Sequence, residues 1–448
     1  MLHDNPQAAS VHRAELLAAF SYALDITEGQ PEGHCIRSCW IGMHVGRALG
    51  LGERELGELY YTVLLKDLGC SSNAARICEL YAADDRAFKQ GFKTVGTGLA
   101  ATLHFVFSRT ARGQSWPRRA AKIGNILAHG DSIAQELILS RCTRGADIAR
   151  ALRFPEPVCT GIYHLDEHWD GSGRPGRLSG HRIPRLSNIA LLAQVVDVFH
   201  GHAGRNASID EVERRAGTWF DPEIAAAFVG VARDDRFWAM LASPVLPATV
   251  VALAPTDDEA VIDDDYLDTI AAAFGEVIDA KSPFTSGHSR RVAGYAEALG
   301  LKAGIAGDAI SALRRAALLH DVGKLGVSSA VLEKPSGLDD REWVEMRDHA
   351  EHTRAILSRI GAFAGLADLA AAHHERLDGR GYPRRLQGHE IGRETRIITI
   401  CDFYDALTAD RPYRAAMSTH EALAIMAGEV GGAIDGDCFE LLKAHVAS

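Results

Sequence analysis

Apolar residues recur at spacings of three and four along almost the whole chain, which is the period of a helix with one buried face. One such stripe consists of Leu267, Ile270, Phe274, Val277 and Ile278. Another consists of Trp343, Met346, His349, Thr353, Ile356 and Ile360. The alternating pattern of a half-buried strand is scarce. The sequence therefore predicts an all-α protein.

The stretch 243–265 interrupts this helical pattern. It reads SPVLPATVVALAPTDDEAVIDDD, with three prolines followed by an acidic run, and both features are typical of connectors. Its apolar VVALA core indicates a connector that packs on its neighbours rather than a loose tether. We therefore expect two parts, 1–242 and 266–448, joined by a linker over 243–265.

The two parts repeat one pattern, so we call them the first copy (1–242) and the second copy (266–448). YYTVLLKDLGCSS matches RRAALLHDVGKLGVSS and aligns Asp67 with Asp321, while an upstream match aligns His34 with His288. Both pairs are 254 residues apart (321 − 67 and 288 − 34). DGSGRP at 170–175 and DGRGYP at 378–383 are only 208 apart. The first copy is thus enlarged by about 46 residues (254 − 208), which we place within 80–140.

Composition and charge exclude several classes of protein. The 448 residues are 47% hydrophobic and 24% charged, as in ordinary globular domains. A net charge of −11 argues against binding DNA or RNA duplexes, because that binding needs a basic surface. Eight scattered cysteines without a CxxC pair indicate a reduced cytoplasmic protein. No signal peptide or membrane-length apolar run is evident, so we expect no membrane partner.

Histidine is abundant, with 20 residues, and it is the commonest protein ligand for metals. In the second copy, imidazoles and carboxylates interrupt the apolar faces of five predicted helices: His288, His320, Asp321, His349, His373, His374 and Asp402. Buried groups of this kind are costly unless they are paired or bind metal. We therefore expect them to converge on two divalent cations bridged by Asp321. Nitrogen and oxygen donors without thiolate favour Fe or Mn, with Zn or Ni as alternatives.

Several motifs follow one another between about 276 and 435: TSGHSRRV, HDVGK, KPSGL, HAEHT, HHERLDGRGYP and DFYDALTADRPYR. Together they resemble the HD-GYP domain, a branch of the HD metal-dependent phosphohydrolases that hydrolyses bacterial cyclic dinucleotides. The resemblance implies that the fold is a tandem of HD helical bundles. It also implies that the metal ligands are the seven residues named above. Members with three metals have a glutamate where this chain has Phe284, so two metals are implied.

The resemblance further implies a reaction and its catalytic residues. Two cations would activate a water for in-line attack on a phosphodiester, with Asp321 orienting the metals. Lys324 would offset the charge that grows on the phosphoryl oxygens. Candidate substrate contacts are Arg376, Arg380, Gly381, Tyr382, Pro383 and Arg411. The alternative for the three arginines is a solvated or structural role, and the family's frequent Trp is here Leu377.

The implied substrate is cyclic-di-GMP, opened to linear pGpG and further to GMP. An alternative keeps the reaction but changes the substrate to cyclic GMP-AMP. Hydrolysis of mononucleotides or of a guanosine polyphosphate is a further rival, against which the complete GYP loop argues. A non-catalytic module that binds a nucleotide or a signalling partner protein is the alternative from another class. A homodimer is the default oligomeric state.

The first copy has lost most of these ligand positions. His34 and Asp67 survive, and the position of His349 falls near Cys142. The remaining replacements for His320, His373, His374, Asp402 and Lys324 are Lys66, Leu165, Asp166, Gln194 and Cys70. We therefore expect a degenerate scaffold or sensor, with the nearby His164 and His168 as surface or core residues. In the extra segment we favour ordinary core, over a ligand pocket or a dimer seam, for Phe88, Phe92, Phe105, Phe107 and Trp116.

Overall fold

A computed structural model describes residues 13–93, 99–112, 114–255, 262–410 and 414–447. Within these ranges the chain forms helices and no strand, apart from three isolated bridges. The prediction of an all-α fold is confirmed. The described helices also include none that is long and apolar enough to cross a membrane.

The first copy and the linker form the following helices, with η marking a 3-10 helix: α1 (Arg13–Thr27), α2 (His34–Ala48), α3 (Glu53–Leu64), η1 (Cys70–Asn73), α4 (Ala74–Tyr81), α5 (Asp85–Lys93), α6 (Leu99–Arg109), α7 (Trp116–Ala151), α8 (Glu156–Tyr163), η2 (Gly180–Arg182), α9 (Arg185–Arg215), α10 (Pro222–Val231), α11 (Asp235–Leu241) and α12 (Leu246–Val251). The apolar VVALA core of the linker thus lies in and just after α12, which packs against α1 and α2. This packing fits the prediction of a connector held against the body.

The second copy forms α13 (Asp264–Asp279), η3 (Pro283–Thr285), α14 (His288–Lys302), α15 (Asp308–Leu319), η4 (Val322–Gly326), α16 (Ser329–Leu332), α17 (Asp340–Ser358), η5 (Gly361–Leu366), α18 (Ala367–Ala371), η6 (Gly388–Glu390), α19 (Arg393–Thr408), α20 (Thr419–Ala427) and α21 (Gly436–Val446). Local sequence fixes where these helices start. At α17, the Asp339 carboxylate accepts hydrogen bonds from the backbone N–H groups of Arg341 and Glu342, while the Glu342 side chain accepts one from the Asp339 N–H. Such a capping box satisfies N–H groups that the helix leaves free.

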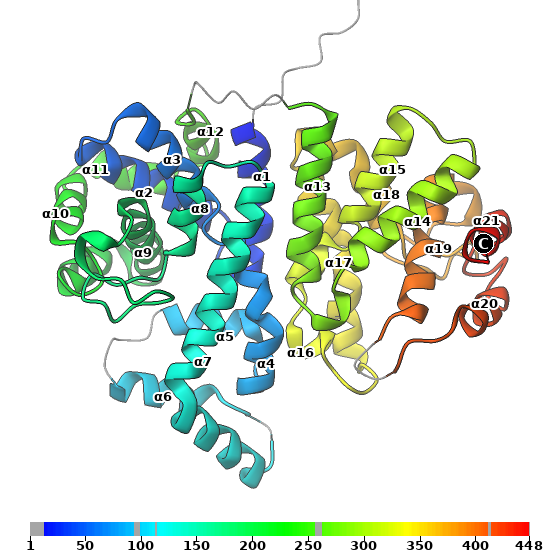
Figure 1. Cartoon of the computed structure of the whole chain (residues 1–448), viewed down its shortest axis with the longest axis horizontal. Helices are drawn as coiled ribbons and strands as arrows, with labels where there is room; N and C mark the ends of the chain where they lie inside the picture. Colours follow the sequence, from blue (N-terminus) through cyan, green and yellow to red (C-terminus); the bar gives the residue numbers. More distant parts are fainter. Residues whose placement is uncertain (1–12, 94–98, 113, 256–261, 411–413, 448) are drawn as a thin grey trace, which may run out of the picture.

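The two copies share one hydrophobic core. Helix α1 of the first copy lies between the two halves and faces α13 and α17 of the second (Figure 1). The Phe20 ring stacks on Phe274 with centroids 3.7 Å apart and meets the edge of Phe363 at 5.7 Å. Because these side chains are fully buried, the copies are held by apolar contact as well as by ion pairs.

The extra segment of the first copy forms α5, α6 and part of α7, and α6 with the start of α7 projects from the body (Figure 1). Phe88 and Phe105 are core residues, as expected, in a small separate cluster. The same expectation is wrong for Phe92, Phe107 and Trp116, which are 52%, 48% and 79% exposed. A projecting hairpin has too few neighbouring elements to cover every aromatic ring.

Candidate metal centre

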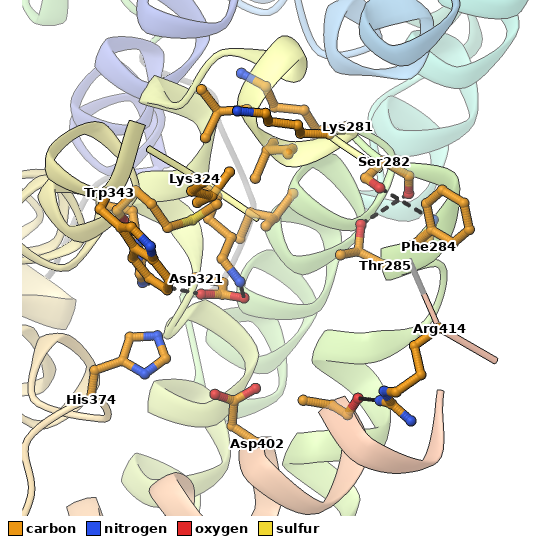
Figure 2. A pocket seen from close by; sticks show the side chains of 18 of the residues that line it. Lys281, Ser282, Phe284, Thr285, Asp321, Lys324, Trp343, His374, Asp402 and Arg414 are labelled. Atoms are coloured by element: carbon orange, nitrogen blue, oxygen red, sulfur yellow. Dashed lines mark hydrogen bonds and ion pairs between the residues drawn. The ribbon is translucent and has the colours of Figure 1, made fainter. Parts of the chain in front are cut away.

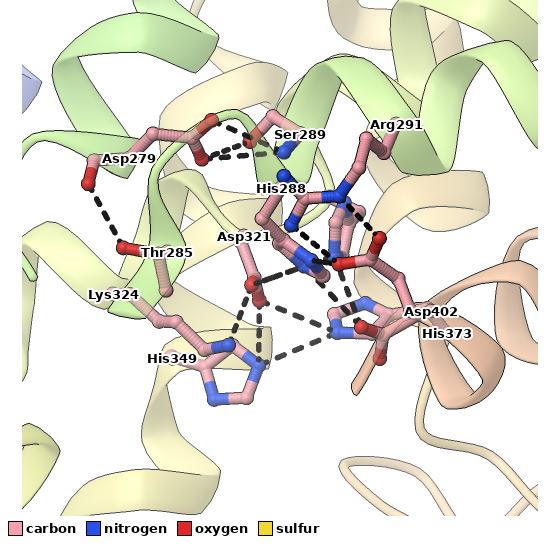
Figure 3. A network of polar contacts seen from close by, with 12 residues as sticks. Asp279, Thr285, His288, Ser289, Arg291, Asp321, Lys324, His349, His373 and Asp402 are labelled. Atoms are coloured by element: carbon pink, nitrogen blue, oxygen red, sulfur yellow. Dashed lines mark hydrogen bonds and ion pairs between the residues drawn. The ribbon is translucent and has the colours of Figure 1, made fainter. Parts of the chain in front are cut away.

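The seven polar residues singled out in the second copy converge in space although they come from separate elements. Figure 3 labels His288, Asp321, His349, His373 and Asp402 among them. His288 is the first residue of α14, and His320 follows the last residue of α15. His349 lies within α17, His373 and His374 follow α18, and Asp402 lies within α19. Gly287 before α14 adopts φ +68°, a left-handed conformation that glycine adopts without a steric penalty.

Asp321 lies at the centre of this cluster and divides it into two groups. Its Oδ2 is 3.6 Å from His288 Nε2 and 3.4 Å from His320 Nε2. Its Oδ1 is 3.6 Å from the Nε2 atoms of both His349 and His373. Asp402 Oδ1 adds a second carboxylate, 3.3 Å from His288 Nε2. One carboxylate with an oxygen toward each imidazole group is the arrangement of a bridged pair of metal sites.

The other ring nitrogen of each of four histidines is already occupied. His320 Nδ1 lies 2.7 Å from the Ala317 carbonyl and His373 Nδ1 lies 2.6 Å from that of Ala370. His349 makes the same contact with the carbonyl three residues before it. His288 Nδ1 instead lies 2.7 Å from Asp405 Oδ2. These contacts fix the rings so that each Nε2 points into the cluster, as they do around protein-bound metals.

Several inward atoms find no hydrogen-bond partner, which is the property that a cation would explain. His288 Nε2, His320 Nε2 and Asp321 Oδ1 are buried and make no hydrogen bond within the described structure. The Nε2 atoms of His349 and His373 face one another at 3.4 Å, although their Nδ1 atoms are committed to carbonyl groups. Buried polar atoms are rarely left unpaired. The donor set therefore fits divalent metal ions.

The electrostatics of the cluster divide its histidines, because a metal ligand must bind without its proton and only some of these rings already lack it near pH 7. Burial lowers the pKa of His349 to about 3 and that of His374 to about 4, so both rings are neutral near pH 7. Burial also lowers the pKa of His320, but Asp321 and Asp402 outweigh it and raise the pKa to about 9. Burial alone would raise the pKa of Asp321, yet Lys324 and the adjacent histidines hold it well below its usual range.

A cavity of about 730 Å³ opens onto this cluster (Figure 2). Its polar wall contains Asp321, Lys324, His349, His374 and Asp402, and Lys324 Nζ lies 2.5 Å from Asp321 Oδ2. Its apolar wall includes Phe284, Trp343, Met346 and Phe403. A mostly apolar hollow with a few converging polar groups is typical of a small-molecule site.

The predicted substrate residues are placed unevenly around this cavity. Tyr382 lines the cavity. Gly381 lets the GYP loop pack closely on the residues before it, because a Cβ at this position would lie 2.5 Å from Glu375 Cα. Pro383 and Arg380 are not among the lining residues, and Arg411 lies outside the described residues. Arg376 also lies outside the lining, since its guanidinium pairs with Asp378 at 2.8 Å and faces Glu429.

The cavity is also lined by Trp343, Lys281, Lys334 and Arg414, none of which was assigned to the site from the sequence. Lys334 and Arg414 belong to the quoted motifs KPSGL and DFYDALTADRPYR, so a signal was present for these two. Trp343 was expected in a buried stripe, and that expectation is wrong, since the side chain is 43% exposed. The wall of a cavity has the same helical period as a core face, so spacing alone carries no signal that separates them.

In the first copy, cationic side chains occupy the place of imidazoles. Lys66, at the position of His320, forms a buried ion pair with Asp67. The position of His349 is taken by Arg141 rather than Cys142, which corrects the alignment by one residue. A Cβ on Gly69 would collide with the Arg141 carbonyl, just as one on Gly323 would collide with the His349 carbonyl. Arg141 in turn pairs with Asp166, the counterpart of His374.

Helix α5 of the extra segment brings two further cations to this degenerate centre. Lys93 Nζ lies 2.6 Å from the buried Glu28 carboxylate. Lys89 Nζ donates to the Cys70 carbonyl at 2.6 Å. Glu28, Asp67 and Cys70 lie close enough to resemble a metal site, but the lysines already balance their charge. The prediction of a degenerate first copy agrees with this geometry.

The chain matches the HD-domain family over residues 114–224 and 273–438. It is 51% identical over 430 residues to the 3'3'-cGAMP-specific phosphodiesterase 3 of Vibrio cholerae serotype O1, covering 96% of this chain and 94% of that protein. A cyclic di-GMP phosphodiesterase of Pseudomonas aeruginosa is 40% identical over 125 residues, 28% of this chain and 30% of that protein. A crystal structure of a cyclic GMP-AMP-specific phosphodiesterase from V. cholerae superimposes with a TM-score of 0.65 at 45% identity, covering 97% of both chains.

Proposed function

The chain belongs to the HD-domain family, in its HD-GYP branch, and we propose that it is a metal-dependent phosphodiesterase that hydrolyses 3'3'-cyclic GMP-AMP. The observation that carries the proposal is the convergence of His288, His320, His349 and His373 on the two oxygens of Asp321 beside the large cavity. A purely nucleotide-binding module would have no need of such a donor set. This geometry therefore favours the enzyme over the non-catalytic alternative.

The choice of substrate differs from the one that the motifs alone put first. The sequence placed cyclic-di-GMP first and cyclic GMP-AMP as its alternative. The cyclic GMP-AMP-specific relative is similar along almost the whole chain, whereas the cyclic di-GMP phosphodiesterase is similar over little more than a quarter of it. The alternative is therefore the better supported substrate, and we adopt it.

The chain's own residues would prepare a phosphodiester for cleavage in three ways. Divalent metals, held by the seven residues of the centre, would supply Lewis-acid activation of water and of the phosphoryl oxygens. Asp321 would orient the two metal ions. Lys324 would face the phosphoryl oxygens and offset their negative charge. The apolar wall around Trp343 and Phe284 would exclude water and offers flat surfaces to purine bases.

We further propose two metal ions, with Fe or Mn preferred and Zn or Ni as alternatives. Phe284 lines the cavity and has no ligating atom, so the chain lacks the glutamate that a third ion uses in related enzymes. A cytoplasmic location is supported by eight cysteines that are all free and of which seven are buried. The homodimer and the signalling partner stay predictions from the sequence.

The test is a direct comparison of substrates with purified protein loaded with Mn or Fe. Cyclic GMP-AMP and cyclic-di-GMP are offered separately at equal concentration, and products are separated by chromatography. We expect faster turnover of cyclic GMP-AMP, and none in a His320→Ala/Asp321→Ala variant. Faster turnover of cyclic-di-GMP would contradict the substrate, and no turnover of either by metal-loaded protein would contradict the enzyme.

A further inference from the structure

Helix α5 belongs to the first copy, but its first residues contact the second copy. Asp85 Oδ1 accepts a hydrogen bond from the Ser329 backbone N–H at 3.0 Å. The Arg86 guanidinium donates to the Gly326 carbonyl and pairs with Glu345 at 3.1 Å. These contacts join residues about 240 positions apart in the chain.

The segment 322–332, which α5 contacts at Gly326 and Ser329 near its middle, carries part of the site. Its first half is η4, which contains Lys324, and its second half contributes Leu332 to the cavity wall. The turn between the halves is held by Glu345 Oε1, which accepts the Ser328 N–H at 2.7 Å and also faces Arg86. We call 322–332 the catalytic loop.

Two of the side chains near the catalytic loop are buried, whereas Arg86 and Glu345 are 28% and 35% exposed. Asp85 is fully buried and Lys281, which lines the cavity, is 1% exposed. Lys281 Nζ donates to the Leu325 carbonyl at 2.7 Å, so it holds the catalytic loop from the cavity side. Burial lowers the pKa of Lys281 to about 8, and the nearby Asp85 carboxylate acts in the opposite direction. Charge-assisted hydrogen bonds of this kind are roughly twice as strong as neutral ones.

The opposite end of α5 is fixed in the degenerate centre of the first copy. Lys93 pairs with Glu28, and Lys89 donates to the Cys70 carbonyl, as described above. Gly29 adopts φ +64°, and a Cβ on it would lie 2.7 Å from the Arg86 carbonyl oxygen. The turn after α1 therefore packs directly on α5, and the helix cannot shift without disturbing the first copy.

We propose that Asp85 and Arg86 are positioning residues for catalysis in the second copy. The degenerate first copy acts through α5, which holds the catalytic loop so that Lys324 faces the reacting phosphate. This inference rests on the proposed function, because it assigns a role within that same site. Neither residue lines the cavity, so they act through the loop and not by touching substrate.

Arg86→Ala tests the proposal through kinetics. We expect kcat to fall roughly 10- to 100-fold, the usual effect of a small misplacement of catalytic groups. KM and bound metal should stay unchanged. The matched control is Arg359→Ala, which removes another ion pair between the copies, with Glu32, and a contact over the Tyr22 ring at 3.8 Å. An equal loss in both variants, or no loss in Arg86→Ala, would overturn the proposal.

A second experiment asks whether Arg86 acts through Lys324. The variants Arg86→Ala and Lys324→Ala are compared with the double variant, since residues that act as a unit give non-additive effects. We expect the double variant to be no slower than Lys324→Ala alone. Multiplied effects would mean that Arg86 contributes independently of the catalytic loop and would contradict its assigned role.

Hydrogen exchange provides a readout that needs no activity. In Arg86→Ala and in Asp85→Asn, amides of the catalytic loop should exchange faster, while those of α14 and α19 keep their wild-type rates. Arg359→Ala should leave the loop unchanged. Unaltered loop exchange in both α5 variants would refute the inference even in an active enzyme. Faster loop exchange in a protein that cleaves no cyclic dinucleotide would support the loop contact and refute the proposed function.

Discussion

Replacing Lys66 by methionine tests whether an ion pair does in the first copy what metals do in the second. Lys66 and Asp67 are both buried, and burial is the largest influence on each. Their attraction outweighs it: the pKa of Asp67 is lowered to about 2, and that of Lys66 is raised. Methionine keeps the volume of the lysine stem but removes its charge.

The loss of unfolding free energy depends on which polar groups would still surround Asp67 in the variant. Its remaining polar neighbours include the Cys35 and Cys70 thiols, at 3.5 and 3.6 Å, and His34 Nε2 at 3.9 Å, while the more distant Lys93 and Glu28 act on it in opposite directions. Thiols are weak donors. Breaking a buried pair by removing one partner costs about 3–5 kcal/mol of unfolding free energy. For a domain of the size of the first copy, this loss should lower the unfolding temperature by roughly 6–20 °C.

The sign of the pH effect provides an independent test. The folded pKa of Asp67, about 2, lies below the ordinary value of about 3.9. Its pairing therefore stabilises the fold above about pH 4, and this stability is lost as the pH falls toward 2. In Lys66→Met the attraction of the lysine is gone, so the pKa of the Asp67 carboxyl should rise. The difference between wild type and variant should thus be largest at neutral pH and shrink below pH 4.

Calorimetry from pH 3 to 7, together with metal analysis by mass spectrometry, measures both effects. Lys66→Met should unfold at a lower temperature and keep its full metal content. The matched variant His320→Met, at the equivalent position of the second copy, should lose metal. If Lys66→Met lost metal, or unfolded as wild type does, cationic replacement of a metal site would be the wrong description of the first copy.

Three further changes have defined outcomes. Chelation should abolish hydrolysis and lower the unfolding temperature in calorimetry, because buried imidazole nitrogens are then left unpaired, and added Mn should restore both. Asp405→Asn should weaken metal binding about 10- to 100-fold in a titration, because Asp405 orients His288. Burial and Lys66 lower the pKa of His34 to about 4, below its ordinary value of about 6.5. Stability should therefore fall by roughly 3 kcal/mol as the pH drops from 6.5 to 4, and His34→Gln should remove this dependence in urea titrations.

The sequence was sufficient to predict the helices and the converging ligands. Each ligand interrupts an apolar stripe or ends one, so burial and polarity could be inferred together, as at His349 and His320. The internal repeat aligned His288 with His34. In the structure each of the two residues begins its helix directly after a glycine in the left-handed conformation. These features depend on short stretches of chain, which a sequence displays directly.

Features that depend on distant contacts could not be predicted. Arg141 was missed because the extra segment shifts the register just before it, and only the close approach of Gly69 identifies it. Asp85 and Arg86 resemble ordinary charges at the start of a surface helix, since their partners lie far away in the sequence. Trp343 was misassigned because a cavity wall and a core face share one period.

The two copies meet one electrostatic requirement by different means. Both retain a carboxylate at the centre, Asp67 or Asp321, and a buried imidazole that contacts a second aspartate, at 2.6 Å in the first copy and 2.7 Å in the second. A buried carboxylate needs a nearby cation. The second copy leaves imidazoles free to bind one from solution, whereas the first copy supplies Lys66 and Arg141 from its own chain. A centre whose cations are side chains of its own chain needs no access for ions from solvent, so α5 can pack on it through Lys89 and Lys93 while its first residues contact the other copy.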